Sequence, residues 1–129
     1  MKFINVTLIT TTISLFTSFV AAQNSEDFIL FACIGVDFYK KSVQDSAAKS
    51  HRLGRETING YPTFYNLRGL PGSRPHKLFP MIPNIHVYNG ESDLRYFLIV
   101  DSEGDYQGMV YQTRSRYEPC TRVTHEFMR

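Results

Sequence analysis

The sequence is poor in the side chains that bind metals or form disulfide frameworks. It has only two cysteines and four histidines in 129 residues. No two histidines have HxH or HxxxH spacing, and neither cysteine has a second cysteine or histidine at zinc-binding spacing. These absences argue against a zinc site and against metal-dependent catalysis, so we expect no metal and no cofactor.

Long apolar runs are also missing after residue 22. Before that point, Lys2 precedes an apolar run over residues 6–20, and the small residues Ala21 and Ala22 follow it. This layout is typical of a secretory signal peptide over residues 1–22, which would leave one domain over residues 23–129. The run is shorter than the roughly 20 residues of a spanning helix, so we expect no membrane anchor. The alternative is a first helix that stays in the fold.

The two cysteines lie near the ends of the predicted domain. Cys33 comes soon after the signal peptide and Cys120 lies close to the C-terminus. A secreted chain passes through an oxidising compartment, so we predict that they pair. Because the closed loop is long, the bond would add about 4 to 5 kcal/mol by loop-closure entropy. A reactive or metal-binding cysteine is the alternative.

Charge is divided unevenly along the chain, although the net charge is only +2. Residues 40–77 carry eight basic side chains against two acidic ones, whereas residues 91–105 carry five acidic side chains against one basic. A basic helix and loop could hold a phosphate backbone or an acidic partner. The alternative is ordinary solvated charge on a surface helix.

The first half of the predicted domain indicates a short lead over residues 23–27, a strand and a helix. Residues 28–34 form an apolar run of strand length, and Asp37 could cap a following helix. That helix would bury a stripe with three- and four-residue spacing and would end at Gly54. The stripe consists of Tyr39, Val43, Ala47 and Ser50.

The second half has the pattern of an antiparallel sheet. Apolar and aromatic runs predict strands over residues 61–65, 78–82 and 85–88, and a final strand over residues 122–127. The clearest element is a hairpin with strands over residues 95–101 and 106–113. A strand, a helix and then a sheet make the expected fold class α+β.

Several short motifs follow one another in a distinctive order. Phe31-Ala32-Cys33 follows the signal peptide; then come one helix, a Tyr-Pro strand at 61–62, a Phe-Pro strand at 79–80, a long hairpin and Cys120. This order resembles the small secreted guanyl-specific ribonucleases of fungi. It resembles even more their derivatives, the ribonuclease-like (RALPH) effectors of powdery mildews, which carry an aromatic-x-Cys motif and a late partner cysteine. The resemblance covers nearly all of residues 23–129 and implies an N-terminal helix packed on a curved antiparallel sheet.

Ribonucleases of this type need a general base, a general acid and charged groups around the phosphate. The resemblance places their first histidine at Thr63, their glutamate at Leu78 and their second histidine at Gln112. Their arginine falls on Arg95 by motif context or on Phe97 by counting from the hairpin glycine, and both positions share a strand face. We therefore expect no catalytic residues and a vestigial cleft, formed by Tyr61, Thr63, Leu78, Arg95 and Gln112.

An inactive fold of this kind implies a secreted effector that binds host plant proteins or RNA, suppresses immunity and is recognised by immune receptors. It would act inside the host cell after translocation, or between cells. Aromatic and basic side chains on and after the Tyr-Pro strand suit base stacking and phosphate binding, although they could equally be sheet core and a solvated loop. The candidate binding residues are Tyr61, Tyr65, Arg68, Arg74, His76 and Lys77.

The alternative function is an active guanyl-preferring endoribonuclease, for which His76 and Arg95 would be the pair to test. For receptor recognition, the sequence points to two exposed loops. These are the basic loop over residues 66–77 and the acidic hairpin turn over residues 101–105.

Overall fold

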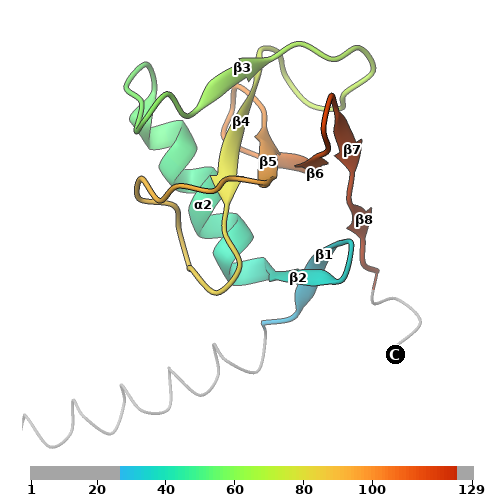
Figure 1. The fold of residues 1–129 in the computed structure, drawn as a ribbon. Coiled ribbons are helices and arrows are strands. Elements are labelled where there is room, and N and C mark those ends of the chain that lie inside the picture. Colours follow the sequence, from blue (N-terminus) through green and yellow to red (C-terminus); the bar gives the residue numbers. More distant parts are fainter. Residues whose placement is uncertain (1–26, 125–129) are drawn as a thin grey trace, which may run out of the picture.

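The computed structural model describes residues 27–124, so the predicted signal peptide lies outside the described residues. Within that range one helix is combined with two antiparallel sheets, which confirms the α+β class (Figure 1). The larger sheet has the strand order β3-β4-β5-β6-β7 and the smaller one β2-β1-β8. The elements are β1 Ile29–Cys33, β2 Val36–Tyr39, α2 Lys40–Leu53, β3 Thr63–Tyr65, β4 His76–Met81, β5 Tyr96–Val100, β6 Tyr106–Gln112, β7 Tyr117–Pro119 and β8 Thr121–Arg122.

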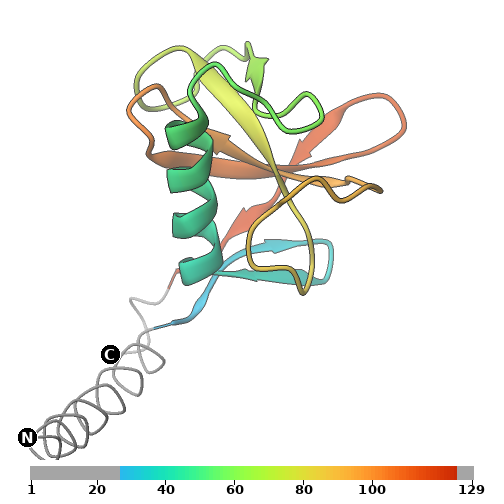
Figure 2. The same ribbon diagram turned by 90° about the vertical axis from the view of Figure 1, so that its left-hand side faces the viewer.

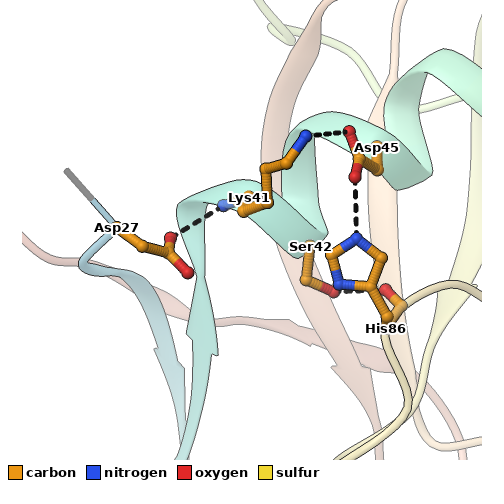
Figure 3. A network of polar contacts seen from close by, with 5 residues as sticks. All are labelled: Asp27, Lys41, Ser42, Asp45 and His86. Carbon is orange, nitrogen blue, oxygen red and sulfur yellow. Dashed lines mark hydrogen bonds and ion pairs between the residues drawn. The ribbon is translucent and has the colours of Figure 1, made fainter. Parts of the chain in front are cut away.

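The helix begins later than the sequence predicts, because a hairpin comes first. Gly35, at a φ of 85°, turns the chain so that β2 pairs back onto β1. Asp37 consequently lies exposed in β2, and its predicted capping role is wrong. The cap comes from Asp27 instead, whose carboxylate accepts a 3.0 Å hydrogen bond from the amide of Lys41 in the first turn (Figure 3).

Polar contacts also tie the first turns of α2 to the loop that follows β4. Asp45 accepts a 3.2 Å hydrogen bond from the Lys41 ammonium and bonds the His86 imidazole at 2.7 Å, and the Ser42 hydroxyl donates to the His86 carbonyl (Figure 3). Burial raises the pKa of Asp45, but the bonds from His86 and Lys41 outweigh it, so the pKa lies below 3.8.

The buried face of the helix is built from small residues. Val43, Ser46, Ala47 and Ser50 are buried against the sheet, whereas Tyr39, which the sequence assigned to this stripe, is exposed because it ends β2. Small side chains let α2 lie close along one face of the large sheet, as Figure 2 shows. Gly54 ends the helix at a φ of 61°, as predicted.

Residues 85–88, predicted as a strand, form part of an irregular loop. Only Tyr88 of this segment is buried: its ring lies in the core and its hydroxyl donates to the carbonyl of Ile58 over 3.2 Å, whereas Ile85 is 39% exposed. The Lys49 ammonium holds the same segment by donating to the Tyr88 carbonyl over 2.7 Å. Side chains from the helix and the core therefore replace a strand partner here.

The predicted long hairpin is the centre of the large sheet. Strand β5 is buried along its whole length and lies between β4 and β6. Strand β7 adds one edge, and the chain then leaves this sheet, because β8 pairs with β1 of the small sheet. Of the predicted last strand, residue 122 lies in β8, residues 123 and 124 follow it, and residues 125–127 lie outside the described residues.

A disulfide bond joins Cys33 to Cys120, as predicted, with the Cα atoms 4.6 Å apart. It lies where β8 returns to β1, so the bond and the strand pairing together tie the two ends of the described chain. Apolar side chains fill both faces of the large sheet, one cluster beneath the helix and a second on the opposite face. The second face carries the candidate site.

Candidate binding cleft

Strand register brings the predicted cleft residues to one face of the large sheet. Thr63 of β3 pairs with Leu78 of β4, which in turn pairs with Ile99 of β5. Directly opposed residues of neighbouring strands point to the same face. Thr63 and Leu78 therefore share a face, with Ile99 beside them.

Arg95 and Gln112 lie further along the same face. The amide of Gln112 donates to the carbonyl of Arg95 over 2.8 Å, so these two residues lie opposite each other. Two residues along each strand, Phe97 pairs with Val110. Alternate residues of one strand point to one face, so Arg95 and Phe97 face the same way as Ile99. Phe97 fills the centre of this face and Arg95 is exposed at its end.

Aromatic rings cover the middle of this face. The centroids of Tyr61 and Phe97 lie 5.5 Å apart, those of Phe97 and Tyr117 5.7 Å, and those of Tyr65 and Tyr117 5.6 Å. Tyr65 belongs to β3 and Tyr117 to β7, which are opposite edges of the sheet. The sheet therefore curves, so that its edges approach each other over this face. We call the face the cleft.

The floor of the cleft is apolar. Leu78 is only 1% exposed and packs in one cluster with Phe97, Ile99 and Val110. Thr63 and Gln112 lie exposed on two sides of that floor, with a hydroxyl and an amide respectively. Such a surface can stack rings and exchange hydrogen bonds, but Thr63, Leu78 and Gln112 have no group that titrates near neutral pH.

Two of the tyrosines have a raised pKa. Burial, and next the neighbouring Tyr117, raise the pKa of Tyr61 and of Tyr65 above the ordinary 10.0. Phenols are protonated at neutral pH even at the ordinary pKa, so both side chains can donate hydrogen bonds there. Tyr117 was missed by the sequence analysis, because its membership of the cleft depends on β7 pairing with β6.

A pocket of about 390 Å³ opens beside the cleft, where the loop after β3 meets the start of β4. Four of the six predicted binding residues line it. The buried one is His76, 4% exposed, whose Nε2 bonds the carbonyl of Pro71 at 2.7 Å. Since a carbonyl only accepts, Nε2 must carry a proton. The full lining is Tyr65, Asn66, Leu67, Arg68, Arg74, Pro75 and His76.

The other two predicted binding residues lie elsewhere. Tyr61 belongs to the aromatic cover of the cleft. Lys77 follows His76 by one residue and so points to the opposite face, where its ammonium donates to the Gly54 carbonyl over 2.8 Å and lies 5.0 Å from the centre of the Phe64 ring. Lys77 is thus separated from the arginines with which the sequence grouped it.

His76 and Arg95, the pair considered for an active ribonuclease, are not neighbours. Lys77 pairs with Val100 at one end of β4 and Met81 pairs with Tyr96 at the other. His76 and Arg95 extend these two ends, so they are separated by roughly 20 Å along the strands, at about 3.3 Å per residue. One phosphodiester group cannot contact both.

Most residues of the acidic turn and of the basic loop are exposed, as the sequence predicts, but the two loops are in contact and Asp101 is buried between them. Asp101 is only 6% exposed and accepts hydrogen bonds from the amides of Ser73, Glu103 and Asp105 and from the Gln107 side chain. Burial raises the pKa of Asp101, but these four bonds outweigh it and place the pKa below 3.8. Asp101 is thus a buried anchor that fixes the basic loop onto the hairpin.

Among residues 27–124 no group of three or more His, Cys, Asp or Glu side chains is arranged to hold a metal ion. No helix in the described range is long and apolar enough to cross a membrane. In comparisons with known proteins, no protein-family model and no curated protein matches the chain. Its function therefore has to be inferred from the cleft and the neighbouring pocket.

Proposed function

We propose that the chain is a secreted effector with a catalytically inactive, ribonuclease-like fold. It binds a host plant protein or RNA, suppresses immunity by doing so, and is itself a target of host immune receptors. One observation carries the proposal. The three positions at which the resemblance expects titrating groups, Thr63, Leu78 and Gln112, share one face and bear side chains that cannot exchange protons near neutral pH.

Three features of the fold support this proposal. Helix α2 (Lys40–Leu53) covers a five-stranded antiparallel sheet, as the resemblance implies. A disulfide joins the predicted cysteines, Cys33 and Cys120. The cleft keeps an aromatic cover suited to stacking a base or packing against a protein side chain, with neutral phenols as hydrogen-bond donors.

Catalysis and binding are separated by one assay. The chain, secreted by an expression host and with its disulfide intact, is incubated with single-stranded RNA from acidic to alkaline pH. We expect no cleavage beyond the spontaneous rate. If RNA binds, its affinity should fall steeply with rising salt, since phosphate contacts release counterions.

Cleavage that peaks near neutral pH and disappears in His76→Ala would overturn the proposal in favour of an active endoribonuclease. Because His76 is buried, that variant needs a check of its fold by circular dichroism. A second variant, His76→Gln, keeps a side-chain donor for the Pro71 carbonyl but cannot act as an acid or base near neutral pH. Cleavage that survives both substitutions would also contradict the proposal, with catalysis at another residue.

A further inference from the structure

Strand β3 has an open edge. Among the described strands it pairs only with β4, and it ends the order of the large sheet. In an antiparallel pair only part of each strand's amides and carbonyls point to the partner, and the remainder point outward. Outward-pointing groups of this kind can accept an extended segment of another chain as an added strand.

The first of two pockets flanking this edge lies on the helix side of the sheet. It has a volume of about 260 Å³, and Phe64 of β3 lines it together with Pro75 and Val100. Phe64 is 69% exposed, which is high for so large an apolar side chain. Charged residues of both signs, Asp101 and the cations Arg55 and Lys77, also belong to the lining, so the apolar anchor that this pocket offers is the exposed Phe64 ring.

The second pocket is the one beside the cleft, on the opposite face of β3. Tyr65, the next residue after Phe64, lines it with Arg68 and Arg74. Both arginines are exposed, and neither takes part in an ion pair within residues 27–124. Leu67, also in this lining, is 51% exposed. This pocket therefore offers two arginines without an ion-pair partner in the described range, beside apolar surface.

Cations predominate in the segment that contains this edge, although Asp101 and Glu103 of the hairpin turn bond Ser73 of the basic loop. Residues 57–90 contain no aspartate or glutamate, whereas Arg68, Arg74 and Lys77 fall within them. Guanidinium groups bind carboxylates in paired, charge-assisted hydrogen bonds. The surface is thus complementary to an acidic chain on the Arg68 and Arg74 side and to an apolar one on the Phe64 side.

We propose that the open edge of β3 binds an extended segment of a partner protein in which acidic and apolar side chains alternate. Successive side chains of an added strand point to opposite faces, so its acidic residues reach Arg68 and Arg74 while its apolar residues enter the Phe64 pocket. The inference rests on the proposed binding function and names the chemistry of the protein partner. It differs from RNA binding in needing a main-chain strand partner and an apolar anchor.

The test uses two short capped peptides of equal composition. In the first, Glu and Leu alternate; in the second, they follow a Glu-Glu-Leu-Leu repeat, which cannot send one residue type to each face. Binding to the secreted, disulfide-bonded chain is measured by calorimetry. We expect the alternating peptide to bind about tenfold or more tightly than the reordered one. Binding should fall by a similar factor in Arg74→Glu and in Phe64→Ser, since both side chains are exposed and their replacement leaves the core intact.

The matched control is Arg114→Glu, the same charge reversal at an exposed residue after β6 that lines neither pocket. Equal affinity for both peptides, no binding of either, or an equal loss in Arg114→Glu and Arg74→Glu would overturn the inference. So would binding of single-stranded RNA, but not of the alternating peptide, through Arg68 and Arg74. None of these outcomes contradicts the proposal that the protein is not catalytic. Cleavage of RNA would contradict that proposal, independently of the peptide-binding result.

Discussion

Gly72 and Asp101 lie in such close contact that a Cβ atom on Gly72 would come within 2.5 Å of the Asp101 carboxylate oxygen Oδ2. Gly72 belongs to the basic loop after β3, and Asp101 follows β5 at the hairpin turn. The amide of Ser73 donates to the same carboxylate over 3.3 Å, and the amide of Ser102 donates to the Ser73 carbonyl over 2.9 Å. Two segments that are distant in the sequence are thus joined by direct hydrogen bonds.

We expect Gly72→Ala to destabilise the protein by about 2 to 4 kcal/mol. Part of this cost arises because Gly72 has a φ of 87°, which L residues rarely adopt, and part because the new methyl group meets Asp101 and Gln107. The matched control is Gly69→Ala, since Gly69 has a φ of 85° but no atom lies within 4 Å of the place that its new methyl group would occupy. Urea unfolding that gives equal losses for the two variants would show that the contact with Asp101 carries no energy.

Asp101 should make stability depend on pH. Its pKa in the folded protein lies below the ordinary 3.8, so its contribution is complete above that value and is lost as the pH falls through the lower, folded-state pKa. Asp101→Asn removes the charge that the four donors share, and we expect a loss of about 1 to 3 kcal/mol at neutral pH. The free-energy difference between the two proteins should shrink on acidification, measured by urea unfolding. A difference that stays constant down to strongly acidic pH would contradict this assignment.

Asp27 rather than Asp37 should stabilise the helix. Asp27→Ala leaves the amide of Lys41 without its acceptor, and we expect a loss of about 0.5 to 2 kcal/mol, the usual range for a helix cap. Asp37→Ala removes an exposed carboxylate from β2 and should stay within about 0.5 kcal/mol of the wild type. Thermal unfolding of the two variants measures the stability that each one loses. A larger loss in Asp37→Ala than in Asp27→Ala would contradict the assignment of Asp27 as the helix cap.

The disulfide should be a large part of the stability margin. Its partners are 87 residues apart in sequence, so reduction or the double substitution Cys33→Ser with Cys120→Ser should cost about 2 to 5 kcal/mol. Unfolding of the oxidised and reduced wild-type protein measures the cost, and the double-serine protein treated with reductant serves as the control for the reductant itself. No shift on reduction would mean that β8 pairing with β1 is sufficient to hold the chain ends.

Local patterns predicted the elements whose residues carry their own signals. The hairpin of β5 and β6 follows from two apolar runs around an acidic turn, and the end of the helix follows from Gly54. The disulfide was predicted from the positions of Cys33 and Cys120, together with the expectation that the chain is secreted. In each case a few neighbouring residues, or the only available pair, determine the outcome.

The errors arose where distant contacts decide local structure. Asp37 has the right chemistry for a cap, but the turn at Gly35 places it in a strand, and Asp27 reaches the helix from 14 residues away. Within residues 85–88 only Tyr88 is buried, and nothing local shows that Lys49 of the helix will bind its carbonyl in place of a strand partner.

For the cleft, the sequence predicted which residues belong to strands but not which residues of different strands lie side by side. Thr63, Leu78, Arg95 and Gln112 share a face only through strand register, which the sequence does not specify. The sequence allowed His76 and Arg95 to be a catalytic pair, but the same register places them at opposite ends of the paired strands β4 and β5. Asp101 counted as one charge of an acidic turn, and only the fold turns it into a buried acceptor.

The bond between Cys33 and Cys120 also determines how the protein could be pulled through a narrow pore. Tension applied at the two ends of the described chain would pass through the sulfur atoms and bypass the residues between them, which include the helix and the large sheet. A threading machine would have to feed that segment through as a doubled strand. Passage through such a pore would therefore require a reductant, and the redox state of the compartment on the entry side would set its rate.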